Sequence, residues 1–389
     1  MAEFPRILLV TRNLPPLLGG MERLNWHMAE QLGKEAEVRI VAPNASSAPP
    51  GITLRGVLAR PTSRFLLSAG WSALQEALRW RPHIVLAGSG LTAPIAWLAA
   101  RSSGARAAVY LHGLDIGLRH PLYRWGWLPF IRRMDLVVSN SEATRRMAIE
   151  RGVDAGRIRL LHPGVEPPPT AEPHAPSDGA FRATYGLALG PILLSVGRLT
   201  ERKGLREFVR DVFPLIARDE PEVQLVVVGD SASDALVARS QSKQSILHEA
   251  ARHGLEARIH FVGTIVERAE LSRAYFSAAV HVFPVREISG DPEGFGMVAI
   301  EAAAHGLPTV AYATGGVVDA VKEGTSGYLV PPHDATKFAE AVCKSLHARL
   351  PAQPMHRFAL RFAWPTFGAS LRDALGVADN DAPPKTTSG

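Results

Sequence analysis

Two carboxylates flank a glycine-containing turn in the second half of the chain, within the segment EGFGMVAIE of residues 293–301. Gly294 and Gly296 can adopt backbone angles that are closed to other residues, so a ligand could approach the main chain closely here. Residues 297–304 carry a helical pattern directly after the glycines. The free N–H groups and the partial positive charge at the N-terminus of such a helix favour a phosphate.

The carboxylates themselves, Glu293 and Glu301, suit a different part of a ligand. An ionised carboxylate only accepts hydrogen bonds, so it fits the hydroxyl groups of a ribose or a hexose. Taken alone, the segment also fits a solvated pair of glutamates at the start of a helix, which is the commoner meaning of such a pattern.

Two cations follow a predicted buried strand at residues 192–196. Arg198 and Lys203 come just after the end of this strand, where open α/β sheets bind their ligands. Arginine binds phosphate oxygens in a bidentate manner, and lysine adds a mobile point charge. Together with the carboxylate segment, this arrangement is expected of a site for a phosphorylated sugar derivative.

The two segments together resemble those of glycosyltransferase family 4, the retaining sugar-nucleotide-dependent enzymes with the GT-B fold. Other motifs follow in the family's order over most of the chain: Gly19-Gly20-Met21-Glu22, His112-Gly113-Leu114-Asp115, Ser139-Asn140-Ser141, His162-Pro163-Gly164-Val165-Glu166, Gly315-Gly316 and Gly327-Tyr328-Leu329-Val330. His162 and Pro163 depart from the usual Pro-Asn of the fourth motif.

The resemblance implies an α/β protein of the GT-B class, with two Rossmann-like domains facing across a cleft and a C-terminal helix that crosses back to the first domain. We expect an acceptor-binding domain over residues 1–169 with the crossover helix at 365–378, and a nucleotide-sugar-binding domain over 170–364. The proline-rich composition around Pro169 is typical of a linker. The polar residues 379–389 are expected to be disordered.

The hydrophobic pattern agrees with this architecture, because short apolar segments alternate with amphipathic ones, as in parallel α/β proteins. The length of 389 residues also exceeds what a single core usually organises. The predicted strands lie at residues 6–10, 38–42, 84–87, 107–111 and 136–139 in the first half, and at 192–196, 224–228, 259–262, 280–283 and 309–312 in the second.

The resemblance assigns roles to individual residues. The catalytic set is His112, Arg198, Lys203 and Glu293: His112 would face the donor sugar, with Asp115 orienting its ring, and the two cations would stabilise the leaving diphosphate. The donor-binding set is Gly19, Gly20, Arg198, Lys203, Gly229, Val262, Glu293, Gly294, Phe295, Gly296 and Glu301. No acceptor-binding residue can be assigned, and the resemblance implies that neither a metal ion nor another cofactor is required.

Composition limits the partners and the compartment. The net charge of +6 suggests an anionic partner, and no helix-turn-helix, zinc-ligand spacing or aromatic RNA-binding motif favours nucleic acid. The single cysteine, Cys343, cannot form an internal disulfide, and no stretch approaches the ~20 apolar residues of a membrane span. These features predict a cytoplasmic protein.

Two stretches of the first half combine arginine with aromatic residues, at 60–67 and 120–133, with Trp71 and Trp80 nearby. Such a mixture suits a lipid headgroup interface, and it equally suits packing of the first domain's core. The first explanation predicts peripheral association with the inner face of the plasma membrane.

The sequence is therefore interpreted as that of a retaining, metal-independent hexosyltransferase. It would move a hexose from a nucleoside-diphosphate sugar to a glycan or lipid-linked acceptor in cell-surface polysaccharide or glycolipid synthesis. Two alternatives are a GT-B sugar-nucleotide epimerase and a non-catalytic scaffold subunit that binds sugar nucleotides. The intact set of His112, the two cations and the two glutamates argues against the scaffold.

Overall fold

The computed structural model describes residues 4–168, 178–231 and 239–377. The chain divides into two compact units, which are treated separately below. Unit 1 contains Met1–Gly164 and Trp364–Gly389, and unit 2 contains Val165–Ala363.

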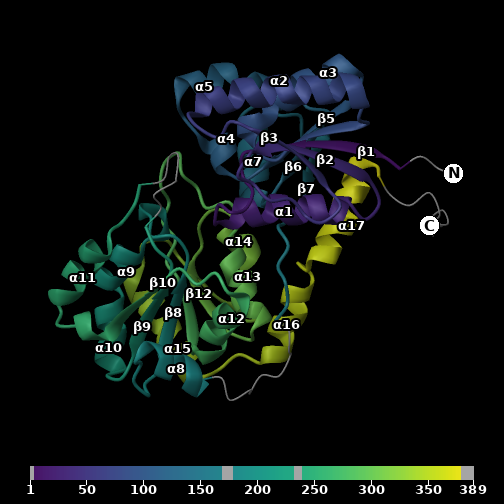
Figure 1. Ribbon diagram of the computed structural model, residues 1–389. Helices are drawn as coiled ribbons and strands as arrows, with labels where there is room; N and C mark the ends of the chain where they lie inside the picture. The colour runs from purple at the N-terminus through teal and green to yellow at the C-terminus, as the bar shows by residue number, and fades with distance from the viewer. Residues whose placement is uncertain (1–3, 169–177, 232–238, 378–389) are drawn as a thin grey trace, which may run out of the picture. The chain divides into compact units, whose positions relative to one another are not determined.

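Unit 1 is built on a seven-stranded sheet in the order β3-β2-β1-β4-β5-β6-β7, and every pair of neighbours is parallel (Figure 1). Parallel neighbours need crossover connections, and helices supply most of them. The elements are β1 (Arg6–Val10), α1 (Gly20–Leu32), β2 (Glu37–Pro43), β3 (Thr53–Val57), α2 (Thr62–Trp80), β4 (Ile84–Ala87), η1 (Gly90–Thr92), α3 (Ala93–Ser103), β5 (Arg106–Leu111), α4 (Leu114–Gly117), α5 (Pro121–Gly126), α6 (Leu128–Arg132), β6 (Leu136–Ser139), α7 (Glu142–Glu150), η2 (Ala155–Arg157), β7 (Ile158–Leu160) and α17 (Trp364–Leu375).

Helices α2 and α3 cover one face of this sheet, and α1 and α17 lie on the opposite face (Figure 1). Alternate strand residues such as Leu8, Val10 and Val85 join Phe65 of α2 in one buried cluster. Because strand side chains point alternately to the two faces, the central strands must be apolar throughout to bury both.

The C-terminal helix α17 packs on unit 1, as the family resemblance predicted. Trp364 and Phe367 are both buried, and the Trp364 ring stacks on His27 of α1 at 4.1 Å between ring centroids. Arg372 pairs with Glu35 at 2.9 Å, and Gly368 lies against Gln31, where a Cβ atom would come within 2.8 Å of the side chain. The helix thus closes the first unit with residues from the far end of the sequence.

Unit 2 is built on a six-stranded sheet in the order β10-β9-β8-β11-β12-β13, again parallel throughout. This is the strand order of the dinucleotide-binding α/β fold. The elements are α8 (Asp178–Tyr185), β8 (Ile192–Val196), η3 (Glu201–Lys203), α9 (Leu205–Asp211), α10 (Phe213–Asp219), β9 (Gln224–Val228), α11 (Lys243–Ala251), η4 (Glu256–Arg258), β10 (Ile259–Gly263), α12 (Arg268–Ser277), β11 (Val280–Phe283), α13 (Met297–Ala304), β12 (Thr309–Tyr312), α14 (Val317–Ala320), β13 (Gly327–Val330), α15 (Ala335–His347) and α16 (Ala352–Leu360).

The two faces of this sheet are buried by different helices. Leu193 of β8 belongs to a cluster with α9, α10, α11 and α15, whereas its neighbours Ile192 and Leu194 belong to a cluster with α8 and α12. The strand alternation therefore fixes which side chains face each layer of helices, and it leaves the loops at the strand ends to carry function.

All ten strands predicted from the sequence are present, and three further strands were not predicted: β3, β7 and β13. Each of the three lies at an edge of its sheet and is only partly buried. An edge strand packs fewer neighbours, so it lacks the continuous apolar run that reveals a central strand.

The first unit ends at Gly164, ahead of the predicted boundary at residue 169, and α17 begins at Trp364. Pro169 itself and the predicted disordered tail at 379–389 lie outside the described residues. No helix in the described part of the chain is both long and apolar enough to span a membrane.

Candidate functional site

The order of strands in unit 2 predicts where a ligand should bind. The order reverses between β8 and β11, because the connections from these strands lead to opposite sides of the sheet. Ligands of open α/β sheets bind beyond the carboxyl ends of the strands at such a reversal. Residues 197–204 follow β8 and residues 284–296 follow β11, and these two loops carry most of the predicted catalytic residues.

The two loops meet in a cluster of four charged side chains. Glu293 pairs through its Oε2 atom with both Arg202 and Lys203, and its distance to Lys203 Nζ is 2.9 Å. Arg202 also approaches Asp291, with 3.1 Å between Nε and Oδ1. All four side chains are 80% or more buried, so these are ion pairs with limited access to water.

Burial and charge act against one another in this cluster. Burial raises the pKa of Glu293, but the charges of Arg202 and Lys203 outweigh it, and the pKa falls to about 2. Burial lowers the pKa of Lys203, an effect that Glu293 opposes and that the Arg202 charge reinforces. Glu293 is therefore an ionised acceptor at neutral pH, as a contact to sugar hydroxyls requires.

A glycine contact holds the two loops together. Gly204 has a φ of 70°, and a Cβ atom there would come within 2.1 Å of the carbonyl oxygen of Pro284. The N–H of Arg286 donates to the carbonyl of Arg202 at 2.8 Å. The glycine after Lys203 thus allows the first loop to lie directly against the second.

The remaining predicted donor residues of unit 2 lie at neighbouring strand ends. Gly229 follows β9 with a φ of 135°, and a Cβ atom there would come within 2.0 Å of the Gly197 carbonyl oxygen. Val262 lies in β10, the next strand along. Arg198 is partly exposed, and it makes no ion pair with any residue that the structure describes. Its guanidinium is therefore available to an anion.

The loop before α13 is supported by the glycines after β12. The N–H of Gly316 donates to the carbonyl of Glu293 at 3.0 Å, and a Cβ atom on Gly316 would come within 2.0 Å of the carbonyl oxygen of Gly294. Gly296 is the N-cap of α13 with a φ of 97°, and Phe295 is buried. This packing places Glu293 before the helix and Glu301 inside it, as the sequence predicted.

Glu301 is buried in a network that the sequence did not reveal. The hydroxyl of Tyr275 donates to its Oε2 atom at 2.9 Å, and both side chains are more than 90% buried. The ring of His305 stacks on Tyr275 at 4.8 Å, and its Nδ1 lies 2.7 Å from the carbonyl of Glu301. Tyr275 therefore fixes the carboxylate that was predicted to bind the ribose.

In unit 1, His112 lies after β5 and next to the strand-order reversal between β1 and β4. Its Nε2 atom is 2.8 Å from the carbonyl oxygen of Gly88, the residue after β4. A carbonyl oxygen only accepts, so Nε2 carries a proton, and Nδ1 has no hydrogen-bond partner among the described residues.

The suggestion that Asp115 orients the ring of His112 is wrong. The carboxylate of Asp115 instead accepts from the backbone N–H of His112 at 3.1 Å. Asp115 is only three residues after His112, so its carboxylate can accept from the main chain of the turn. The carbonyl of Gly88 orients the ring of His112 instead.

Gly19 and Gly20 lie at the start of α1, where donor contacts were predicted. The buried carboxylate of Glu22 occupies the same place: a Cβ atom on Gly19 would come within 2.4 Å of its Oε2, and its Oε1 accepts from Asn13 at 2.6 Å. A side chain at position 19 would therefore displace the carboxylate of Glu22 from its place over the helix N-terminus.

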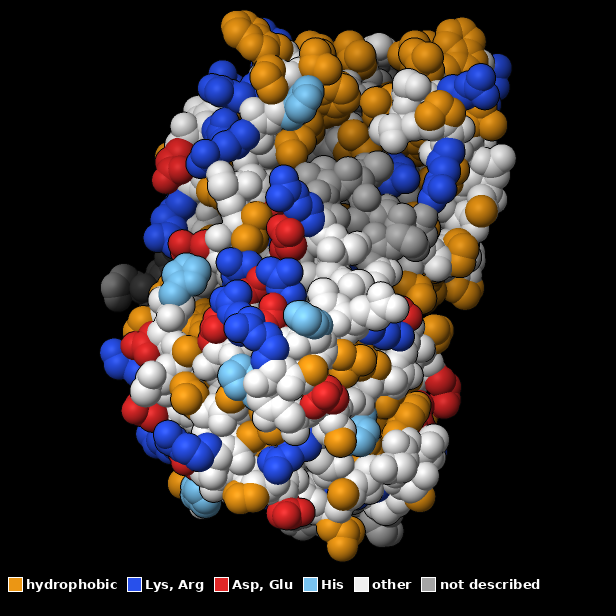
Figure 2. Space-filling model, turned by 90° about the vertical axis from the view of Figure 1, so that its left-hand side faces the viewer, with side chains coloured by type: hydrophobic (Ala, Val, Ile, Leu, Met, Phe, Trp, Pro, Cys, Tyr) orange, Lys and Arg blue, Asp and Glu red, His pale blue; other side chains and the backbone are white. Residues whose placement is uncertain are grey.

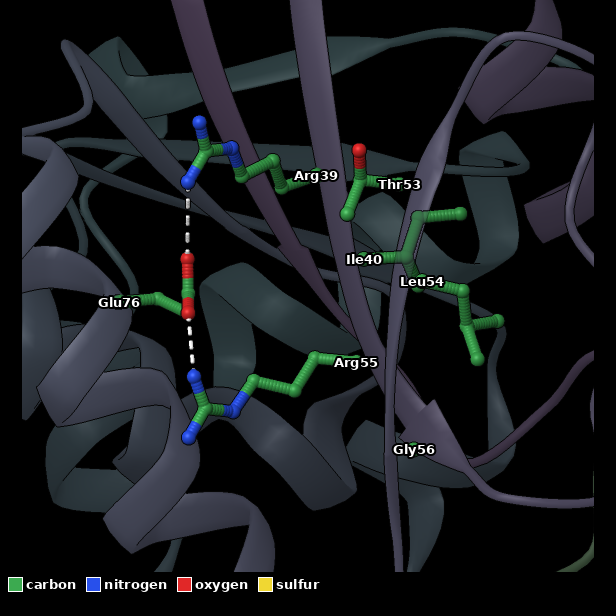
Figure 3. A pocket seen from close by; sticks show the side chains of 7 residues that line it. All are labelled: Arg39, Ile40, Thr53, Leu54, Arg55, Gly56 and Glu76. Atoms are coloured by element: carbon green, nitrogen blue, oxygen red, sulfur yellow. Dashed lines mark hydrogen bonds and ion pairs between the residues drawn. The ribbon is translucent and has the colours of Figure 1, made fainter.

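Unit 1 also contains a cavity of about 430 Å³ beside the edge strand β3 (Figure 3). Arg39 and Arg55 point at the carboxylate of Glu76 from opposite sides, at 3.2 and 2.6 Å. The side-chain oxygen of Gln75 accepts a further hydrogen bond from Arg55 at 2.8 Å. None of the predicted site residues lines this cavity, and the arginines fasten β2 and β3 to α2.

A metal site is not evident in the residues that the structure covers, since no group of three or more His, Cys, Asp or Glu side chains there is arranged to hold an ion. The two acidic residues of the charged cluster, Asp291 and Glu293, are both paired with Arg202.

Two family models match the two halves of the chain. Residues 18–167 match the model described as Glycosyltransferase Family 4, and residues 190–348 match that described as Glycosyl transferases group 1. The chain belongs to the group 1, family 4 glycosyltransferases. The motifs at the reversal points of both sheets lie within the matched ranges.

Two curated relatives are named as sugar-transferring enzymes. The GDP-mannose-dependent alpha-(1-6)-phosphatidylinositol monomannoside mannosyltransferase of Mycolicibacterium smegmatis is 29% identical over 95% of this chain and 98% of its own. The D-inositol 3-phosphate glycosyltransferase of Mycobacterium tuberculosis is 30% identical, over 62% of this chain and 49% of its own length.

Solved structures match nearly the whole chain and establish the GT-B fold. Anabaena HepE in complex with UDP and glucose is 20% identical, with a TM-score of 0.76 over 95% of this chain and 99% of its own. Sucrose-phosphate synthase of Thermosynechococcus elongatus is 22% identical, with a TM-score of 0.77 over 96% of this chain and 100% of its own.

Sequence reasoning missed the partners of the predicted residues: Arg202 and Asp291 beside Glu293, Tyr275 beside Glu301, and Gly88 beside His112. Arg202 is adjacent to Lys203, and Asp291 is close to Glu293 in the chain. The clustering of charged residues in these two short segments was the one available signal. Tyr275 and Gly88 are distant in sequence from the residues that they position, and no local pattern marks them.

Proposed function

We propose that this protein is a retaining hexosyltransferase that takes a sugar from a nucleoside-diphosphate donor and passes it to a glycan or lipid-linked acceptor. The observation that carries the proposal is the charged cluster of unit 2, at the reversal point where α/β sheets bind nucleotides. The unpaired Arg198 and the buried Lys203 supply positive charge there, beside an ionised carboxylate.

The proposed reaction breaks the bond between the anomeric carbon and the diphosphate oxygen, and joins that carbon to an acceptor oxygen. The leaving diphosphate gains negative charge, which Arg198 and Lys203 would stabilise. Glu293 would accept from the sugar hydroxyls and Glu301 from the ribose. The proton of the acceptor hydroxyl would pass to the departing phosphate, with retention of the anomeric configuration.

The direct test is a transfer assay with purified protein, preceded by a thermal-shift screen of UDP-, GDP- and ADP-sugars. A donor that binds only the folded protein raises the melting temperature in a concentration-dependent way. GDP-mannose and UDP-glucose come first, since the former is named for one relative and the latter suits the ligands of HepE. NMR of the product should show the anomeric configuration of the donor. Donor isomers formed without an acceptor would instead indicate an epimerase.

The proposal includes catalysis without a divalent metal. Two cations and a helix N-terminus can neutralise a diphosphate by themselves. Turnover should therefore persist in excess EDTA, and added Mg²⁺ or Mn²⁺ should not raise it. Loss of turnover in EDTA with rescue by either ion would show that the diphosphate needs a metal in this site.

A membrane-borne acceptor is supported by an exposed face of unit 1. Four large apolar residues there are 65–84% exposed: Leu67 and Trp71 on α2, and Leu122 and Trp125 on α5. We call these, together with Arg60, Arg64, Arg119 and Arg124, the arginine–tryptophan face. Figure 2 shows hydrophobic and Lys or Arg side chains gathered at the end of unit 1 that carries α2, α3 and α5.

The charge of this face fits an anionic lipid surface. Residues 58–71 and 117–133, which contain it, include no aspartate or glutamate. Other aromatic residues in or near the two stretches pack within the unit, as the alternative explanation predicted: Phe65 and Trp80 are buried, and the indole of Trp127 donates to the carbonyl of Leu91. We propose that the exposed residues dock the protein reversibly on the inner face of the plasma membrane.

Flotation with vesicles tests the docking. Each arginine near an anionic surface contributes about 1 kcal/mol, screened over about 8 Å at physiological salt. The wild-type protein should float with anionic vesicles at low salt, and should be released from them at high salt. The double variant Arg64→Glu/Arg124→Glu should lose flotation. The control, Arg218→Glu/Arg252→Glu, makes the same charge change on exposed arginines of unit 2 and should float normally. Equal behaviour of the two variants would refute the proposed face.

A further inference from the structure

Lys203 pairs with Glu293 in the structure, and the proposed function also requires it to bind the diphosphate of the donor. In the structure its Nζ atom contacts the buried carboxylate of Glu293 at 2.9 Å, and it lies 4.6 Å from the centre of the Phe283 ring. The proposed function requires the same ammonium group to bind the donor's diphosphate. A turn toward the diphosphate would weaken its contact with Glu293, whose side chain is only 10% exposed.

Arg202 is the second partner of Glu293, and its own position is fixed. Its guanidinium spans Asp291 and Glu293, its side chain is 12% exposed, and its carbonyl accepts from Arg286 at 2.8 Å. Unlike Lys203, it is tied to two carboxylates from the loop after β11. It can therefore remain in place when Lys203 moves.

The geometry at the carboxylate supports this division. Both cations contact Oε2 of Glu293, and no described residue pairs with its Oε1. Oε1 therefore remains open to a hydroxyl donor while Oε2 is held by Arg202. Burial raises the pKa of the carboxyl, and the Arg202 charge is the largest influence that lowers it, so Arg202 is the principal cation that keeps Glu293 ionised.

We propose that Arg202 is a positioning residue that keeps Glu293 paired, and thereby releases Lys203 to bind the diphosphate of the donor. This inference rests on the proposed function, since it assumes a diphosphate at Lys203. Arg202 itself touches neither the diphosphate nor the sugar. Its effect on nucleotide binding should therefore pass entirely through Glu293.

The test is calorimetry with the sugar-free nucleoside diphosphate, using whichever of UDP, GDP and ADP the wild-type protein binds best. Arg202→Gln should weaken binding roughly 10-fold, within the range of coupling between residues of one ion-pair network, because Glu293 then retains Lys203. Glu293→Gln should not weaken binding. The double variant Arg202→Gln/Glu293→Gln should bind like Glu293→Gln, because the anion that holds Lys203 is absent.

Two further variants separate this role from a general effect on folding. Arg202→Lys keeps the charge and should bind more tightly than Arg202→Gln. Arg206→Gln removes a nearby arginine that pairs with Glu207 and not with Glu293, and should bind like wild type. Thermal denaturation shows whether each variant is folded. If Arg202→Gln does not fold, the comparison of Arg202→Lys with and without Glu293→Gln provides the same test.

The outcomes distinguish a failure of the proposed role of Arg202 from a failure of the proposed function. If the wild-type protein binds none of the three nucleotides, the proposed function fails and the inference fails with it. If it binds one of them and Arg202→Gln binds equally well, only the inference fails. A double variant as weak as Arg202→Gln would also overturn the inference, because loss of the anion should have freed Lys203.

Discussion

The two sheets have the same parallel architecture and the same reversal of strand order, but different side chains lie at the two reversal points. In unit 2, four buried charged side chains from two loops form a connected cluster. In unit 1, the corresponding loops make hydrogen bonds with few charges, such as that from His112 to Gly88 and that from Asn13 to Glu22.

This difference shows that the fold supplies a location and the loops supply the chemistry. The positive charge of unit 2 suits a ligand with several negative charges. At its reversal point, unit 1 contains the imidazole of His112, one nitrogen of which has no described partner, and the carboxylate of Glu22. Both groups can form hydrogen bonds with hydroxyl groups. We expect unit 2 to hold the diphosphate and the ribose, and we expect both Glu293 of unit 2 and His112 of unit 1 to contact the donor sugar.

The largest expected effect is loss of a cation from unit 2. Lys203→Ala and Arg198→Ala should each lower turnover roughly 10²-fold or more, because one preorganised charge on the developing anion is lost. Steady-state kinetics of sugar transfer measures the effect. Lys337→Ala removes a lysine of α15 that pairs with Asp334 and should leave turnover unchanged. Near-wild-type turnover in Lys203→Ala or Arg198→Ala would contradict the assignment of the diphosphate to unit 2.

A smaller effect is expected from unit 1. His112→Ala should lower turnover roughly 10-fold, the upper end of the range for one lost neutral hydrogen bond. It should leave the affinity for the bare nucleoside diphosphate nearly unchanged, because that ligand is assigned to unit 2. Kinetics and calorimetry on the same preparation separate the two effects. A large loss of nucleotide affinity would mean that unit 1 also holds the diphosphate.

The smallest effects should separate the two glutamates of unit 2. Glu301→Ala should mainly weaken nucleotide binding, and Glu293→Ala should mainly lower turnover. Tyr275→Phe removes only the hydroxyl that holds Glu301, so nucleotide binding should weaken by roughly 2- to 10-fold, the range for one neutral hydrogen bond. Calorimetry with the bare nucleoside diphosphate measures all three. Equal losses of affinity in the two glutamate variants would remove the distinction between ribose and sugar contacts.

Much of the site was predictable because it follows local rules. Gly296 precedes a helix and Gly204 follows the two cations, and both have positive φ angles that glycine adopts readily. The carboxylates at 293 and 301 were correctly placed before and within one helix, since the helical pattern starts at residue 297. Glycine after a strand and periodic apolar residues are signals that a short window of sequence contains.

The sequence could not predict which aromatic residues of unit 1 face solvent. Phe65 is buried and Leu67 is 76% exposed, although they are two positions apart on one helix. The same applies to Trp71 and Trp80, of which the first is exposed and the second is covered by Arg39 at 4.3 Å. Exposure depends on which neighbouring elements cover each face of α2, and this is set by the packing of the unit.

The sequence by itself determined the family, the central strands and the positions of Arg198, Lys203 and Glu293. These follow from periodicity and from motifs whose residues are near one another in the chain. Only the tertiary structure decided that Arg202 shares Glu293 with Lys203, that Tyr275 holds Glu301 and that Gly88 orients His112. Arg202 and Glu293 are 91 positions apart, and they meet because β8 and β11 are neighbours in the sheet. The order of the strands is a property of the whole unit. It depends on how the helices bury both faces of the sheet, and the residues of one strand alone do not determine its neighbours.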